Sequence, residues 1–209
     1  MTEFGLKSFK NLQPNTQVTE LINYIEAELL SFTSSDEFVE ILAKRKNENQ
    51  HSAAFCVYMT NKCKSRFCFQ RENAQKASST VDIGVYRGAV LFFTIEAKVL
   101  PTPISKERKE HEYVYGNGGG IERFKNEKHG LDNKDILLPI NGMIAYIKQE
   151  NFEYWHSKIN QWVLDASWPK SEKLEKLKFS NIARLKSFHK RKNGADLTLH
   201  HFWISVTQN

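Results

Sequence analysis

Long apolar runs and closely spaced cysteines are both missing from this chain of 209 residues. No apolar run approaches the roughly 18 residues that a membrane-spanning helix needs, so we expect no transmembrane segment and no membrane partner. The N-terminal segment lacks the apolar stretch of a signal peptide. Three cysteines at irregular spacing argue against a disulfide framework. The expected compartment is therefore the reducing cytoplasm.

A strong charge excess is missing too. Thirty Lys and Arg residues against 24 Asp and Glu residues give a net charge of +6, which permits an anionic partner without demanding one. With 40% hydrophobic and 26% charged residues, the composition is that of a globular chain with a core of its own. Because no repeat or low-complexity linker divides the sequence, we expect one domain over residues 1–209.

Residue patterning predicts an α/β domain. Apolar residues at helical spacing predict helices over Val18–Phe32, from Asp36 to about Asn49, from Ile121 to about His129, and over Asn151–Ala166. Alternation predicts strands at Ala53–Thr60, Arg66–Arg71, Thr80–Tyr86, Ala89–Leu100 and Leu197–Val206, and another strand within 135–148. The first two strands are expected to form a hairpin. The order suits a central mixed sheet flanked by helices.

One segment carries most of the excess charge. Between Ser171 and Lys192, eight cations stand against two anions, a net +6 that equals the charge of the whole chain. Apolar residues recur there at roughly helical spacing, so we predict an amphipathic helix with a basic outer face. Such a helix alone is typical of a solvated surface. It becomes a nucleic-acid face only if another feature implies a polyanionic substrate.

Two charged residues interrupt the apolar run 89–100. Glu96 and Lys98 share one face of the predicted strand, whereas the opposite face is wholly apolar. Charges in such a strand are costly unless they have partners or a function. Asp82 of the preceding strand joins their face if the hairpin loop has an odd number of residues. Three loop residues place it opposite Thr94, five place it opposite Glu96, and an even number turns it away.

This set of residues suits phosphodiester hydrolysis. Two neighbouring carboxylates bind Mg²⁺ or Mn²⁺. The metal polarises a phosphoryl oxygen and lowers the pKa of a bound water, and a nearby lysine positions that water or stabilises charge on phosphorus. The alternative is a partly buried Glu–Lys pair that braces the sheet.

The pattern Val81-Asp82, then thirteen intervening residues, then Glu96-Ala97-Lys98 resembles the PD-(D/E)XK nuclease superfamily. The resemblance covers about residues 36–130, and Val81 stands where that family commonly has proline. It implies a restriction-endonuclease-like core, which C-terminal helices and a closing strand at 151–207 would follow. It also implies that Asp82, Glu96 and the main-chain carbonyl of Ala97 bind the metal and that Lys98 assists the water.

The family often adds a glutamate from the helix before the sheet. Glu37, Glu40 and Glu48 are alternatives for this role, and Glu48 is nearest to the first strand. The three cysteines lack zinc-site spacing and are interpreted as small buried residues. His200 and His201 point to opposite faces of their strand, so they cannot bind one metal together.

The resemblance implies a Mg²⁺-dependent nuclease, with DNA favoured over RNA, of a kind often found as an effector of bacterial defence or repair. Phosphate contacts are then expected from the glycine loop and the basic segments, at Gly119, Gly120, Arg123, Lys178, Arg184, Lys186, Lys190, Arg191, Lys192 and 44–46. Glu122 or Lys125 would border the site. Such a small domain suggests a homodimer or a subunit of a larger complex.

Two rivals stay open. One is the same fold kept as a non-catalytic module for nucleic-acid binding or assembly. The other is an enzyme of different chemistry in which the triplet is incidental, and it predicts that Asp82 faces away from Glu96.

Overall fold

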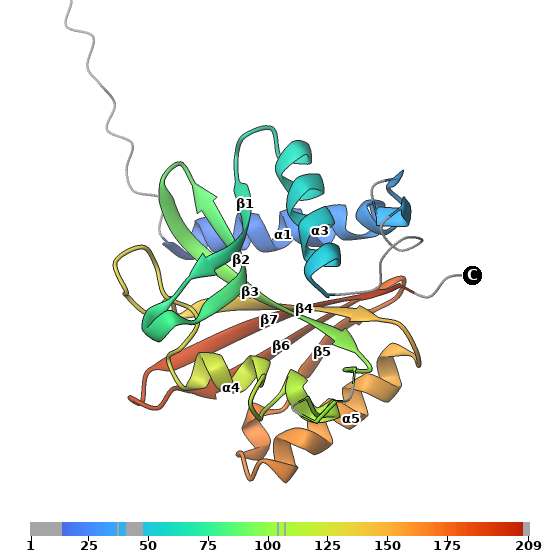
Figure 1. The fold of residues 1–209 in the computed structure, drawn as a ribbon, viewed down its shortest axis with the longest axis vertical. Helices are drawn as coiled ribbons and strands as arrows, with labels where there is room; N and C mark the ends of the chain where they lie inside the picture. The colour runs from blue at the N-terminus through green and yellow to red at the C-terminus, as the bar shows by residue number, and fades with distance from the viewer. Residues whose placement is uncertain (1–13, 37, 41–47, 104, 107, 207–209) are drawn as a thin grey trace, which may run out of the picture.

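The computed structural model describes residues 14–206 except 37, 41–47, 104 and 107 (Figure 1). In this part of the chain seven strands form one mixed sheet in the order β1-β2-β3-β4-β7-β6-β5. The strands are β1 (Cys68–Ala74), β2 (Thr80–Arg87), β3 (Val90–Leu100), β4 (Ile140–Ile147), β5 (Glu175–Phe179), β6 (Ile182–Lys190) and β7 (Asp196–Ser205). The three central strands β3, β4 and β7 are parallel, and an antiparallel pair extends the sheet on each side.

Helices cover both faces of this sheet. The α-helices are α1 (Pro14–Thr33), α3 (Glu48–Lys62), α4 (Gly120–Lys125) and α5 (Phe152–Asp165), and the short 3-10 turns are η1 (Lys76–Ser78), η2 (Glu110–Tyr113) and η3 (Lys170–Glu172). Figure 1 shows α1 and α3 on one side and α4 and α5 on the other. Each side has its own apolar cluster, so the central strands are buried on both faces. The predicted α/β domain with a mixed sheet and flanking helices is confirmed.

Several predicted elements are confirmed. The helices expected at 18–32 and 151–166 are α1 and α5, and the strands expected at 80–86, 89–100 and 197–206 are β2, β3 and β7. The Asn151 side chain accepts a hydrogen bond from the Tyr154 N–H at 2.8 Å and so caps α5. The helix expected from Ile121 is the shorter α4. Part of the helix expected from Asp36 to Asn49 lies outside the described residues.

The predicted strand Ala53–Thr60 is wrong, because these residues belong to α3. This helix packs against α1 and the sheet, so it is buried around most of its circumference and Val57 is its main exposed apolar side chain. A helix that is apolar nearly all round loses the helical period in its sequence. The predicted hairpin with residues 66–71 is therefore wrong as well, and β1 pairs with β2 instead.

The predicted basic helix at 171–192 is also wrong. The segment folds into η3 and the antiparallel pair β5–β6, so α5 is the one α-helix in the described part of 151–207. Two apolar residues that supported the helical period, Leu177 and Phe188, are 54% and 42% exposed and do not belong to the core. Burial along β6 instead brings Leu185, Ser187 and His189 to the same buried face, with the period of a strand.

No helix in the described ranges is both long enough and apolar enough to cross a lipid bilayer.

Candidate metal and catalytic site

The β2–β3 register turns Asp82 toward Glu96. Ile83 pairs with Ile95, and continuing this register by one residue places Asp82 opposite Glu96. The turn itself is even, since Arg87 pairs with Val90, but a β-bulge after Val85 shifts the register by one residue. The expected relation between Asp82 and Glu96 therefore holds, although the expected three- or five-residue loop is wrong. The rival hypothesis predicts an even register at this turn; the turn is even, but the bulge shifts the register before Asp82 is reached.

Three basic side chains surround the buried Glu96 carboxylate. Lys98 Nζ lies 2.7 Å and Arg123 Nη1 lies 3.2 Å from Glu96 Oε1, and His129 Nδ1 lies 3.2 Å from Oε2. Burial alone would raise the pKa of Glu96, but Lys98 and His129 hold it well below its usual range. Glu96 is therefore ionised and its charge is neutralised by the protein itself.

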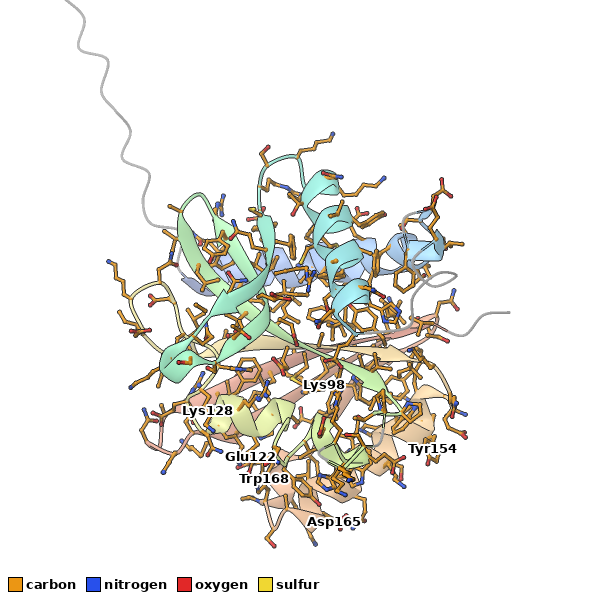
Figure 2. All side chains as sticks on the ribbon, viewed as in Figure 1. Lys98, Glu122, Lys128, Tyr154, Asp165 and Trp168 are labelled. Atoms are coloured by element: carbon orange, nitrogen blue, oxygen red, sulfur yellow. The ribbon has the colours of Figure 1, made fainter. Side chains whose placement is uncertain are left out.

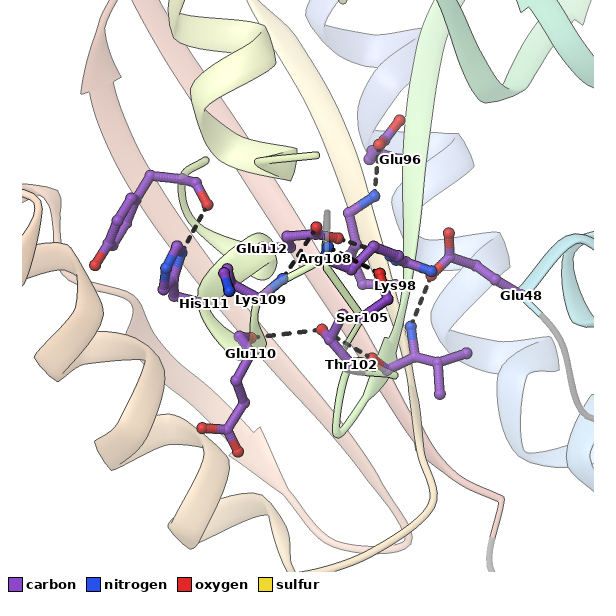
Figure 3. Close-up of polar contacts among 12 residues, drawn as sticks. Glu48, Glu96, Lys98, Thr102, Ser105, Arg108, Lys109, Glu110, His111 and Glu112 are labelled. Atoms are coloured by element: carbon purple, nitrogen blue, oxygen red, sulfur yellow. Dashed lines mark hydrogen bonds and ion pairs between the residues drawn. The ribbon is translucent and has the colours of Figure 1, made fainter. Parts of the chain in front are cut away.

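Lys98 is equally firmly charged. Its side chain is buried, which would lower its pKa, but Glu96, Glu48 and Asp82 together raise the pKa above the usual range. Figure 3 shows the Lys98 ammonium group directed at Glu96. An ammonium group of this kind donates hydrogen bonds and does not serve as a base.

Asp82 lies at the edge of the same cluster. Its Oδ2 accepts a 2.7 Å hydrogen bond from the main-chain N–H of Ala97. Burial, then the charges of Glu96 and Glu48, raise the pKa of Asp82 to about 8, and Lys98 opposes this only in part. Negative charge is thus in excess at Asp82, and the carboxyl group holds a proton at neutral pH.

Glu48 brings a third carboxylate from the first turn of α3. Its Oε2 accepts a 3.0 Å hydrogen bond from the Val99 N–H (Figure 3), two residues beyond the N–H that Asp82 accepts. The N–H and carbonyl groups of a strand residue point to the same side, so the Ala97 carbonyl also lies along this edge of β3. Of the three alternative glutamates, the structure brings Glu48 to β3. Glu40 is exposed, and Glu37 lies outside the described residues.

Arg108 connects Glu48 to a fourth carboxylate. Its Nη2 lies 3.8 Å from Glu48 Oε2, and its Nε lies 2.9 Å from Oε2 of the buried Glu112 (Figure 3). No hydrophobic periodicity in the sequence predicts these contacts, because Arg108 belongs to a polar stretch with no clear period. The same is true of His129, whose contact with Glu96 depends on the path of the chain after α4.

The donors suit a divalent cation in kind, but they are not assembled around one point. Carboxylates and a carbonyl are the ligands that Mg²⁺ prefers, and burial followed by the neighbouring carboxylates raises the pKa of Asp82. In the described part of the chain, however, no three His, Cys, Asp or Glu side chains are placed so that they could hold a metal ion. The reason is that Glu96 is turned to Lys98, Arg123 and His129.

The glycine loop has a packing role. A Cβ atom at Gly119 would lie 2.6 Å from Tyr115 Cα, and one at Gly120 would lie 2.6 Å from Met143 Cε. Both residues are buried: Gly119 lets the loop pack on its own main chain, and Gly120 lets α4 approach β4 closely. This close approach brings Arg123 of α4 to Glu96.

The other residues expected to bind phosphate are mostly engaged within the protein. Arg184 is buried and pairs with Glu26, which also pairs with Lys178. The buried Arg191 donates to the carbonyls of Phe124 and Leu138. Further contacts of this set join Lys186 to the Phe188 ring and Lys190 to Asp196. Lys192 is exposed, and residues 44–46 lie outside the described residues.

The two residues expected to border the site lie slightly apart from it. Lys125 pairs with Glu172 and lies over the Trp168 ring. Glu122 Oε2 accepts a hydrogen bond from the Gly116 N–H at 2.9 Å.

Sequence reasoning also missed a buried polar chain beneath α5. Ser187 Oγ lies 2.7 Å from His189 Nε2 and 2.8 Å from His201 Nε2. The chain continues from His189 to Glu172 at one end and from His201 to Tyr113 at the other. Ser187, His189 and Glu172 have the contacts of a catalytic triad, but Ser187 is fully buried and shares its hydroxyl with a second imidazole. The chain is therefore structural, and His201 belongs to it while the adjacent His200 contacts Arg184.

No protein-family model, no curated protein and no solved structure matches this chain. The assignment of the candidate site is therefore supported by its geometry alone.

Proposed function

We propose that this protein is a divalent-metal-dependent nuclease with a restriction-endonuclease-like core, which hydrolyses phosphodiester bonds in nucleic acid, with DNA favoured. One observation carries the proposal. Carboxylates from three separate elements lie around Lys98: Glu96 of β3 pairs with its ammonium group, and Asp82 of β2 and Glu48 of α3 accept hydrogen bonds from the N–H groups of the residues on either side of it and, with Glu96, raise its pKa. A pair that merely braced the sheet would not need the second and third carboxylates.

The cation would be held by Asp82, Glu48 and the Ala97 carbonyl, together with Glu96 once it leaves its cationic partners. A bound Mg²⁺ or Mn²⁺ ion supplies the charge that polarises a phosphoryl oxygen and acidifies a water molecule. Lys98 keeps its proton and donates a hydrogen bond that orients the attacking water or stabilises charge on phosphorus. Arg123 is 35% exposed, so its guanidinium group can contact the scissile phosphate.

The proposal extends to assembly and biological role. A nuclease that cuts both strands of a duplex needs two sites, which a homodimer or a larger complex would supply. An effector role in bacterial defence or repair is part of the same proposal.

A non-catalytic module of the same fold is the second candidate. The observation in its favour is that Glu96 is neutralised by protein cations and that no three ligand side chains in the described ranges are assembled for a metal. Such a module would bind nucleic acid and leave it intact.

The test compares plasmid, linear DNA and single-stranded RNA in Mg²⁺, Mn²⁺ or EDTA. The variants are Glu96→Gln and Lys98→Ala, and the matched control is Glu175→Gln, an exposed glutamate on β5. We expect metal-dependent cleavage by the wild type and the control, and a loss of about 100-fold or more in the two site variants.

Each other outcome has a definite meaning. Cleavage that survives EDTA or the Glu96→Gln change would refute the proposed site. Nucleic-acid binding without cleavage under any metal condition would favour the non-catalytic module.

A further inference from the structure

A polar groove of about 760 Å³ lies beside α4, next to the candidate site. Lys76 and Ser79 line it from η1 and the residue that follows, and Asn126 and Lys128 line it from the segment after α4. The wall is tied together, because Ser79 Oγ donates a 2.8 Å hydrogen bond to the Lys128 carbonyl. Figure 2 shows two of the lining residues, Glu122 and Lys128, beside α4.

The groove is continuous with the site. Arg123 lines it and also contacts Glu96 at 3.2 Å. Thr80, another lining residue, is two positions before Asp82 on β2. A polymer that occupies the groove is thereby directed toward Asp82 and Glu96.

The charge of the groove suits a polyanion. Lys76, Arg123 and Lys128 supply three cations, and Lys76 and Lys128 are exposed. Among the described residues no carboxylate forms an ion pair with either lysine. The one lining carboxylate, Glu122, accepts a hydrogen bond from the main chain at Gly116.

The lining chemistry also selects the part of a nucleic acid that fits. The described lining residues are Lys, Arg, Ser, Thr, Asn, Gly and Glu, with no aromatic ring among them. Lys, Arg, Ser, Thr and Asn side chains contact phosphates and sugars. Proteins that hold single strands without sequence preference stack the bases on aromatic side chains, which this lining lacks.

We infer that this groove holds the sugar–phosphate backbone of a nucleic-acid duplex, without reading its bases, on one side of the bond to be cut. The location of the cut bond depends on the proposed function, whereas binding in the groove does not. The inferred binding surface is thus at the β1–β2 end of the sheet and not on the segment 171–192.

The test measures binding of a fluorescent DNA duplex and of its single strand by anisotropy in EDTA. The groove variant is Lys76→Ala with Lys128→Ala. The control is Lys176→Ala with Lys178→Ala, which removes the same charge from β5 at the opposite edge of the sheet. Melting temperatures of both double variants check that the fold is intact.

We expect the wild type to prefer the duplex. Each lost phosphate contact lowers the slope of log affinity against log salt by about 0.9, so the groove variant should lose about 2 in that slope between roughly 50 and 200 mM salt. Its affinity at the low-salt end should fall about tenfold or more, with the control close to the wild type.

Three results would overturn the inference: no binding of duplex by the wild type, equal losses in both double variants, or tighter binding of the single strand. A separate cleavage assay distinguishes the two proposals. Failure to cut DNA in Mg²⁺ with groove-dependent binding intact would count against the nuclease alone. Cutting by the wild type with binding insensitive to Lys76 and Lys128 would count against the groove alone.

Discussion

The proposed function needs an ionised Asp82, whereas the folded state is more stable when Asp82 is protonated. Its pKa is raised to about 8 in the folded protein, chiefly by burial and then by Glu96 and Glu48, whereas an aspartate in the unfolded chain has a pKa of about 3.9. Between these two pH values the folded state holds a proton that the unfolded state lacks. The stability that this group contributes is fully present below the unfolded pKa and is lost as pH rises through the folded pKa.

Exchanging Asp82 for asparagine removes this dependence. One proton of difference changes the free energy of unfolding by about 1.4 kcal/mol per pH unit, so the wild type loses about 3 kcal/mol from this group between about pH 5 and pH 7. The asparagine side chain keeps an oxygen that can accept the Ala97 N–H bond, now 2.7 Å long. The free energy of unfolding of Asp82→Asn minus that of the wild type should therefore rise by about 3 kcal/mol over this range and level off above about pH 8.

Urea unfolding in EDTA measures this difference. Histidines that titrate in the same range are present in both proteins and cancel. The matched control is Asp196→Asn, since the Asp196 side chain is 85% exposed and lies outside the site. A constant difference for Asp82→Asn would refute the reasoning. Added Mg²⁺ should reduce the difference, because binding to the folded wild type stabilises it by mass action.

Two further changes test the packing around the site. Ser187→Ala would leave His189 Nε2 and His201 Nε2 without their shared partner, so the free energy of unfolding in urea should fall by about 2–4 kcal/mol, and a fall below about 0.5 kcal/mol would contradict the buried chain. Gly120→Ala would place a Cβ 2.6 Å from Met143 Cε and 3.1 Å from the Tyr113 carbonyl, so we expect a loss of about 1–3 kcal/mol in thermal unfolding, and an unchanged melting temperature would contradict the close approach of α4.

The sequence is informative where one structural period dominates. Helix α5 has one apolar face against the sheet, and its Asn151 cap marks where it begins. Strand β3 alternates between an apolar face and a face with Glu96 and Lys98, so the location of the charged pair follows from the sequence alone. Such elements are recognisable because neighbouring residues on the chain already differ in environment.

The sequence is misleading where environment and residue type disagree. Leu177 and Phe188 are exposed although apolar, and Arg184 and Arg191 are buried although charged. These four residues together imitate a basic amphipathic helix in what is a pair of strands. Burial of the two arginines depends on Glu26 and on carbonyls of distant segments, which no local pattern reveals.

The candidate site also has features that the sequence predicts and features that it does not. Asp82 and Glu96 share a face because of a β-bulge after Val85. Without the bulge, the even turn would place them on opposite faces. Contacts of Glu96 with Arg123 and His129 depend on how closely α4 packs on the sheet. Local sequence thus identifies the acidic and basic groups on β2 and β3, and tertiary packing decides what surrounds them.

The carboxyl groups of Asp82 and Glu96 differ in how their negative charge is compensated. Asp82 holds a proton, while Glu96 is ionised and pairs with Lys98 and Arg123. A divalent cation would replace the proton on Asp82 and would compete with Arg123 for Glu96. Arg123 also lines the groove, so a phosphate there offers it another partner. Under the proposed function, duplex and metal would each weaken the contact between Arg123 and Glu96, and the loss of this contact would favour binding of the other ligand. Linkage then requires that each ligand raise the affinity for the other by the same factor.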